Sequence, residues 1–369
     1  MCLVGTRPEA IKMAPVIRAL QKRAQLKVRV ILSGQHQELL SNTLRAFDLV
    51  GDRNLGVMRP NQSLAGLTAR LFESIDAVLE EEAPDLVVAQ GDTTTVMVAG
   101  VAAFYRGIPF AHVEAGLRTG NLRFPFPEEF NRIVAGRMAA LNFAPTETAR
   151  QALLAEGIAD ATIHVTGNPV IDALLSVAER GETPPWIVAG RRTILLTVHR
   201  RENFGVRLQQ IIAALKTLVA QHPELEFVLP VHPNPNVRDV VQAALGGQEG
   251  RGFTLTEPLD YPDLVMTMKA AELILTDSGG IQEEAPALGK PVLVLRTETE
   301  RPEAIEAGVA KLVGVETADI IREASRLLTD KDAYRAMARR VSPYGDGKAS
   351  ARIAGLVAEF LEAGSAASR

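Results

Sequence analysis

Two carboxylates separated by a loop carry the strongest chemical signal in this sequence. The apolar run that begins at Ile108 ends on His112 and Glu114, and a loop then leads to Glu128. An acid at the end of a buried strand is typical of the active-site edge of an open α/β sheet. If the loop folds back, both acids would face one substrate, a layout that suits proton transfer.

A structural explanation covers only part of this pattern. Glu128 and Glu129 also suit the first turn of a helix, where negative charge is favourable. That explanation leaves Glu114 unaccounted for, because it directly follows a buried strand. Taken alone, the two carboxylates are compatible with proton transfer, glycoside hydrolysis or metal binding.

A third acid follows a different strand. Asp92 stands in the segment Gln-Gly-Asp-Thr-Thr-Thr at positions 90–95. Asp in this position is often just a helix N-cap. Three successive threonines are unusual after a plain cap and would line a polar pocket.

The first strand ends at a possible phosphate site. In the segment Gly-Thr-Arg-Pro-Glu-Ala at positions 5–10, Thr6 and Glu9 have capping-box spacing. Free N–H groups at such a helix start favour phosphate, and Arg7 and Lys12 add positive charge. An ordinary cap with solvated basic residues explains the segment equally well.

Three strand ends in the second half also carry polar groups. His199 is followed by two arginines and an acid, which favours an anion site, and His232 ends the next strand. The segment 277–284 (Asp-Ser-Gly-Gly-Ile-Gln-Glu-Glu) follows a strand and begins a helix, so its glycines would let a phosphate approach the backbone. Glu284 is placed to accept hydrogen bonds from a sugar diol.

Strands and helices must alternate along the chain to position these groups. The apolar runs predict strands at 3–4, 28–32, 86–90, 109–113, 141–143, 163–165, 194–198, 226–231, 253–256, 273–276, 291–295 and 311–313. Amphipathic segments between them, such as 11–23, 65–82 and 208–220, predict helices. Uniformly apolar strands indicate parallel sheets covered on both faces. We expect two doubly wound α/β domains with a cleft between them.

Bulk composition narrows the class of protein. The 369 residues are 47% hydrophobic and 23% charged with a net charge of −4, which predicts a globular protein without a nucleic-acid or membrane surface. One cysteine excludes an internal disulfide and a cysteine metal cluster. No signal peptide, dinucleotide fingerprint, P-loop or metal-ligand spacing is visible, so we expect a cytoplasmic, metal-free enzyme. Only three strand residues, Cys2, Leu3 and Val4, precede the Gly5 turn, which is short for a strand and compatible with residues missing upstream of Met1.

With these motifs in order, the chain resembles the non-hydrolysing UDP-N-acetylglucosamine 2-epimerases. The similarity covers essentially the whole chain. Its motifs are GTRPEAIKMAP, QGDTTT, HVEAGLRTG, PEEFNR, PTETAR, TGNPVIDAL, HRREN, PVHPNP, LTDSGGIQEEAPALGKPVLVLR, TERPEA and PYGDGKAS. The resemblance implies a GT-B-like architecture of two Rossmann-like domains. The first would comprise residues 1–168 with the C-terminal helix in 348–369, and the second residues 169–347.

The resemblance also implies a reaction that needs no cofactor. UDP would leave C1 as a proton leaves C2, and UDP would add back to the 2-acetamidoglucal after protonation on the opposite face. By resemblance the catalytic residues are Asp92, Glu114, Glu128 and His199. The residues that would hold UDP are Arg7, Lys12, Ser278, Gly279, Gly280 and Glu284.

A regulatory UDP-GlcNAc site beside the active site is a further implication of the resemblance. The matching positions are Gln35, Arg70, Glu129, Arg201 and His232. Glu38 stands where the family pattern leads us to expect glutamine, and a carboxylate there would weaken nucleotide binding. The family also implies a homodimer.

Other functions remain open at this point. An epimerase of a related UDP-2-acetamido sugar would share every motif. A GT-B glycosyltransferase would share the UDP-binding half but would not need three acids in the first domain. A nucleotide-sugar sensor would need no acids at all.

Overall fold

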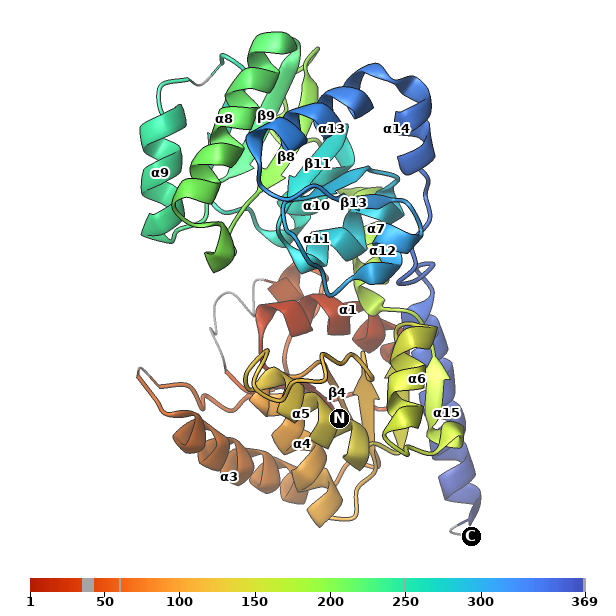
Figure 1. Cartoon of the computed structure of the whole chain (residues 1–369). Helices are drawn as coiled ribbons and strands as arrows, with labels where there is room; N and C mark the ends of the chain where they lie inside the picture. The colour runs from red at the N-terminus through yellow and green to blue at the C-terminus, as the bar shows by residue number, and fades with distance from the viewer. Residues whose placement is uncertain (35–42, 60, 249, 368–369) are drawn as a thin grey trace. The chain divides into compact units, whose positions relative to one another are not determined.

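The chain forms two compact units, each built on one parallel β-sheet (Figure 1). The computed structural model describes residues 1–34, 43–59, 61–248 and 250–367. Unit 1 comprises Met1–Ala173 and Tyr344–Arg369, and unit 2 comprises Leu174–Pro343. The architecture confirms the expectation of two doubly wound α/β domains.

Unit 1 contains a seven-stranded sheet in the order β3-β2-β1-β4-β5-β6-β7. Every pairing in it is parallel, and the central strands are buried along their whole length. Its strands are β1 (Cys2–Val4), β2 (Val30–Leu32), β3 (Arg53–Asn54), β4 (Val87–Gln90), β5 (Phe110–Val113), β6 (Leu141–Ala144) and β7 (Ile163–Val165). Apolar side chains on both faces explain why these strands lack an alternating pattern.

Helices connect the strands of unit 1. They are α1 (Arg7–Gln21), α3 (Leu64–Glu82), α4 (Thr94–Tyr105), α5 (Glu128–Met138), α6 (Glu147–Ala155), η1 (Asp160–Thr162), α7 (Pro169–Arg180) and α15 (Ala349–Ala367). The C-terminal helix α15 packs against α1, and its first turn is held by Asp172 of α7. The Asp172 carboxylate accepts hydrogen bonds from the backbone N–H groups of Ala349 and Ser350 at 3.2 and 2.8 Å. These bonds satisfy groups that a helix cannot satisfy internally.

Unit 2 repeats the same topology with six strands in the order β10-β9-β8-β11-β12-β13. The strands are β8 (Arg192–Thr197), β9 (Leu225–Pro230), β10 (Phe253–Thr256), β11 (Leu273–Thr276), β12 (Val292–Val294) and β13 (Ala310–Leu312). The helices are η2 (Arg201–Asn203), α8 (Val206–Gln221), α9 (Pro235–Leu245), α10 (Tyr261–Ala270), α11 (Gly279–Glu284), η3 (Ala285–Leu288), α12 (Pro302–Glu306), α13 (Thr317–Thr329) and α14 (Lys331–Met337). A core of Leu, Ile, Val and Phe lies between this sheet and α8, α9 and α13.

All the predicted strands are present, with ends that differ by one or two residues. The short strand β3 (Arg53–Asn54) was not predicted, because both of its residues are polar and exposed. It pairs with β2 through Ile31 and Leu32, so the neighbouring strand rather than its own sequence makes it a strand.

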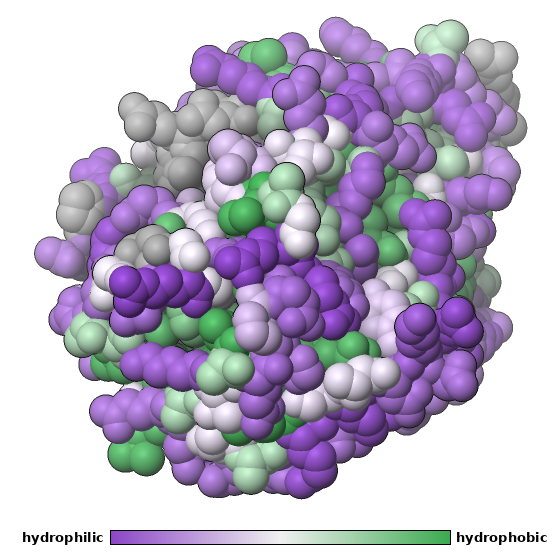
Figure 2. Space-filling view, turned by 90° about the horizontal axis from the view of Figure 1, so that it is seen from above, coloured by the Kyte–Doolittle hydropathy of each residue, from purple (hydrophilic) through white to green (hydrophobic). Residues whose placement is uncertain are grey.

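One face of the molecule is mainly hydrophilic. Figure 2 shows this face, on which hydrophobic residues form only small groups among hydrophilic ones. Within the described part of the chain, no helix has the length and apolarity needed to cross a membrane.

Candidate active site

The strand order places the functional loops of each unit at the centre of its sheet. In unit 1 the order reverses between β1 and β4, which are neighbours, and in unit 2 it reverses between β8 and β11. Ligands of open α/β sheets bind beyond the carboxyl ends of the strands at such a reversal. The segments that follow these four strands carry Arg7, Asp92, His199 and Ser278, and Glu114 follows the neighbouring strand β5.

Glu114 lies at the carboxyl end of β5 and is almost fully buried. Its backbone φ is +63°, a left-handed conformation that costs a residue with a side chain roughly 1–2 kcal/mol. Both carboxylate oxygens lie 2.7 Å from Lys12 Nζ, and Asn168 Nδ2 donates to Oε1 at 3.1 Å. The side-chain amide of Gln90, the last residue of β4, donates to Oε2. Three donors on different elements therefore compensate the buried charge of Glu114.

Asp92 lies in the turn after β4. The alternative reading of Asp92 as a plain helix cap is wrong, because Thr93 is the N-cap residue of α4. The Asp92 carboxylate instead accepts a hydrogen bond from Arg132 Nη2 at 2.6 Å. Burial raises the pKa of Asp92 above its ordinary range; Arg132 opposes this shift, while the charges of Glu114 and Glu128 add to it. Asp92, Glu114 and Glu128 are thus close enough to influence one another electrostatically.

Two neighbouring residues hold these acids in place. His112 is fully buried and donates Nε2–H to the Gly91 carbonyl at 2.7 Å. Burial lowers the pKa of His112 to about 4, so the ring is neutral and supports the turn that carries Asp92. Glu129 is also fully buried, and its Oε1 accepts hydrogen bonds from the backbone N–H groups of Thr119 and Gly120, both at 2.9 Å. Glu129 fixes the loop before α5, whereas Glu128 is only partly buried.

The segment after β1 differs from the expected phosphate loop in one respect. Thr6 and Glu9 form the predicted capping box, and the Glu9 carboxylate also accepts the backbone N–H groups of Gly5 and Thr6. Those two N–H groups are therefore already used. Any anion affinity of this segment depends on Arg7, at the start of α1, and on Lys12.

Two histidines lie together at the carboxyl ends of β8 and β9 in unit 2. The rings of His199 and His232 are stacked, with centroids 5.9 Å apart and planes inclined by 24°. Asp277, directly after β11, lies beside His199 Nδ1. The neighbouring strands thus bring together groups that are far apart in sequence.

Positive charge surrounds the start of α11. Ser278 is its N-cap residue, and Gly279 and Gly280 form its first turn. A Cβ placed on Gly279 would lie 3.7 Å from a guanidinium nitrogen of Arg200 and 3.9 Å from the guanidinium of Arg301. Two guanidinium groups next to the start of a helix are suited to binding a phosphate.

At the other end of α11, Glu284 is nearly buried and accepts a hydrogen bond from the Tyr261 hydroxyl at 2.9 Å. Burial and this carboxylate raise the pKa of Tyr261 well above its ordinary range, so the phenol stays a donor. The bond holds the Glu284 side chain in one orientation, as recognition of a diol requires.

The predicted regulatory residues are distributed over both units. Arg70, on α3, donates Nε–H to the Val57 carbonyl at 3.0 Å, and Arg201 lies exposed in η2. Gln35 and Glu38 lie outside the described residues. The regulatory site stays a prediction.

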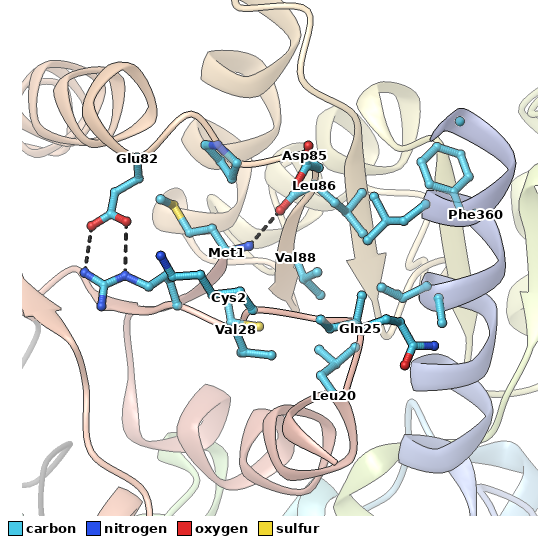
Figure 3. A pocket seen from close by; sticks show the side chains of 18 of the residues that line it. Met1, Cys2, Leu20, Gln25, Val28, Glu82, Asp85, Leu86, Val88 and Phe360 are labelled. Atoms are coloured by element: carbon cyan, nitrogen blue, oxygen red, sulfur yellow. Dashed lines mark hydrogen bonds and ion pairs between the residues drawn. The ribbon is translucent and has the colours of Figure 1, made fainter. Parts of the chain in front are cut away.

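A large pocket of about 1150 Å³ lies elsewhere in unit 1 (Figure 3). It is lined by Met1 and Cys2 of β1, Leu86 before β4 and Phe360 of α15, and the Met1 ammonium donates to the Leu86 carbonyl at 2.8 Å. These residues mark the amino ends of the strands. The pocket is therefore at the edge opposite the candidate active site.

Several residues in these contacts were not predicted as part of the site. They are Gln90, Asn168, Asp277, Tyr261, Arg132, Arg200 and Arg301. Two of them gave a signal in the sequence, because Gln90 and Asp277 are polar residues at the end of a buried strand. Their partners are set by tertiary contacts, which spacing along the chain does not encode.

Two α/β units with acids and cations at the reversals of their strand order define an enzyme of GT-B-like fold that acts on a nucleotide sugar. A family model described as UDP-N-acetylglucosamine 2-epimerase matches residues 18–358. The chain belongs to this family of isomerases acting on carbohydrates, which confirms the resemblance seen in the sequence.

Individual relatives agree with this assignment. The UDP-N-acetylglucosamine 2-epimerase of Escherichia coli K12 is 48% identical over 364 residues, which cover 96% of each chain. The UDP-GlcNAc 2-epimerase of Neisseria meningitidis bound to UDP-GlcNAc is 44% identical with a TM-score of 0.88, covering 97% of this chain and 99% of that one. A crystal structure from Listeria monocytogenes has a TM-score of 0.92 at 45% identity, covering 98% and 96%.

The buried Glu9 carboxyl predicts a pH-dependent stability. Burial raises its pKa from 4.5 to about 7, so in this window the native protein holds a proton that the unfolded chain has released. The contribution of Glu9 to stability therefore falls as the pH rises through this window. Glutamine does not titrate. The difference in the free energy of unfolding, Glu9→Gln minus wild type, should therefore increase by up to about 3 kcal/mol from pH 4.5 to pH 7.5.

Urea denaturation at several pH values measures this difference. Glu73→Gln, on the exposed side of α3, is the control for the substitution itself. A Glu9→Gln difference that stays constant with pH would show that Glu9 ionises in the folded protein as it does in the unfolded chain.

Proposed function

We propose that this protein interconverts UDP-N-acetylglucosamine and UDP-N-acetylmannosamine by inverting C2 of the sugar. The observation that carries the proposal is the grouping of Asp92, Glu114 and Glu128, with Lys12 and Arg132, at the carboxyl ends of the central strands of unit 1. The relative from Neisseria meningitidis that is bound to UDP-GlcNAc supports the choice of substrate.

The proposed reaction has two steps. In the first, a carboxylate takes the proton from C2, the C1–O bond to UDP breaks, and its electron pair leaves with the phosphate oxygen. A double bond forms between C1 and C2, giving a 2-acetamidoglucal. In the second, a proton is returned to C2 on the opposite face and the UDP oxygen attacks C1. Nothing is oxidised or reduced overall, so the carboxylates and the leaving group suffice.

The two units would divide this work. The three acids of unit 1 differ in surroundings: Glu114 is held by three donors, whereas burial raises the pKa of Asp92, which favours its protonated form as a proton donor. Unit 2 would bind UDP at the start of α11, where Arg200 and Arg301 stabilise the negative charge of the leaving group. Glu284 would accept hydrogen bonds from the ribose diol.

Incubation of purified protein with UDP-GlcNAc and EDTA in deuterated water, followed by NMR of the sugar, tests this mechanism. We expect UDP-ManNAc to form with deuterium at C2, because the abstracted proton exchanges with solvent. Inversion without deuterium would indicate hydride transfer instead. Turnover only after addition of an acceptor sugar would indicate a glycosyltransferase, and turnover only of another UDP-2-acetamido sugar would correct the substrate.

The carboxylates provide the second test. Glu114→Gln and Glu128→Gln should lower kcat by about 10²–10⁴-fold, as expected for loss of a proton-transfer group. Both variants should still bind UDP by calorimetry, because the proposed UDP site lies in unit 2. Glu147→Gln, on exposed α6, is the matched control and should retain full activity. Wild-type rates in both acid variants would refute their catalytic roles.

We also propose that the protein forms a homodimer. Exposed aromatic side chains gather on unit 1, among them Phe126 and Phe130, and line an apolar pocket of about 580 Å³ with Phe72 of α3 and Met97 of α4. Contiguous exposed apolar surface of this kind is typical of a protein interface.

Light scattering should therefore give twice the chain mass for the wild type and the chain mass for Phe130→Arg. Val206→Arg, at an exposed apolar position of unit 2, is the control and should remain dimeric. A monomeric wild type would refute the dimer.

A further inference from the structure

The Asp277 carboxylate accepts more hydrogen bonds than a residue of a phosphate-binding loop would require. Asp277 directly follows β11 and is completely buried. Its Oδ2 accepts hydrogen bonds from the backbone N–H of Arg200 at 2.9 Å and from Asn203 Nδ2 at 2.9 Å, and the backbone N–H of His199 lies 3.1 Å from both oxygens. The carboxylate thus ties the loop after β8 to the end of β11.

One further contact involves the ring of His199. Its Nδ1 lies 3.2 Å from Asp277 Oδ1, and hydrogen bonds from His199, Arg200 and Asn203 hold the pKa of Asp277 below its ordinary range even though burial alone would raise it. An ionised carboxylate can only accept. The contact is therefore a hydrogen bond only if Nδ1 of His199 carries the proton, which leaves Nε2 of the neutral ring as the nitrogen that can accept one.

His232 has the opposite arrangement. The backbone N–H of Asn234 donates to His232 Nδ1 at 3.2 Å, so a neutral His232 carries its proton on Nε2. The two stacked rings are therefore held in different tautomers by different partners. Both rings lie at strand ends, yet their tautomers differ. The contact with Asp277, and not the location, therefore sets the tautomer of His199.

We infer that Asp277 is a positioning residue that fixes the Nδ1–H tautomer of His199 and so dedicates Nε2 to proton exchange with the departing UDP. The inference rests on the proposed function. When the C1–O bond breaks, a protonated His199 would donate its Nε2 proton to the leaving phosphate oxygen, and it would take the proton back when UDP adds again. Nδ1–H stays on the ring throughout, and the Asp277 carboxylate balances the charge of the imidazolium.

The substitution Asp277→Asn should reverse the tautomer. More donors converge on the Oδ2 position than on Oδ1, so the asparagine oxygen would occupy the Oδ2 position and its NH₂ group would face His199 Nδ1. A donor in that place requires an unprotonated Nδ1. In the variant, the neutral His199 ring should therefore carry its proton on Nε2. It could accept a second proton only on Nδ1, and that would break the new hydrogen bond.

Long-range ¹H–¹⁵N NMR of protein labelled on its six histidines tests this directly at a pH where the rings are neutral. The His199→Gln variant identifies the His199 resonances. We expect an unprotonated Nε2 in the wild type and a protonated Nε2 in Asp277→Asn. Asp330→Asn is the matched control, because Asp330 accepts two backbone N–H groups without a histidine nearby. Nε2–H in the wild type would overturn the inference even if Asp277→Asn failed to fold.

Kinetics provide the second criterion. Asp277→Asn should lower kcat about 100-fold with KM nearly unchanged, and it should have little further effect in a His199→Gln background. Additive losses in the double variant, or an altered tautomer with wild-type kcat, would overturn the positioning role. If the tautomers are as expected but the protein does not epimerise UDP-GlcNAc, the proposed function fails while the contact between Asp277 and His199 stands.

Discussion

The reversal of strand order at the centre of each sheet is the constraint on which the rest of the structure depends. Parallel strands need crossover connections, so the segments that run outward from β1 and β4, or from β8 and β11, diverge at the point of reversal. No crossover covers the carboxyl ends at this point. Each unit therefore exposes several loop starts side by side, and polar side chains can gather there without interrupting the core.

The charged groups at these edges follow one electrostatic rule. Glu114 and Asp277 are buried, and each is surrounded by N–H donors from two or more segments. Their charges are compensated, so they can remain ionised away from water. Glu9 has two backbone donors as well, but burial outweighs them and raises its pKa to about 7. Both acids are buried, so the number and type of donors decide whether the pKa is lowered, as for Asp277, or raised, as for Glu9.

How much could be predicted differs between the fold and the site. The apolar runs indicated the strands, because strands buried on both faces are continuous in hydrophobicity, and the capping box at Thr6 and Glu9 was confirmed. The helix start was expected to offer free N–H groups to a phosphate, yet the Glu9 carboxylate accepts those of Gly5 and Thr6. Asp92 was open to being a helix cap, yet it pairs with Arg132, forty positions along the chain. Local patterns predict local hydrogen bonds and fail where a distant side chain competes for the same group.

The sequence by itself determined the class of fold, the family and the positions at which acids, histidines and glycines end the strands. These features are encoded locally, in hydrophobic periodicity and in motifs a few residues long. Only the tertiary structure decided which partner each group has: Lys12, Gln90 and Asn168 for Glu114, and His199 for Asp277. Residues up to 102 positions apart meet because parallel strands align their carboxyl ends, and no spacing along the chain records that alignment.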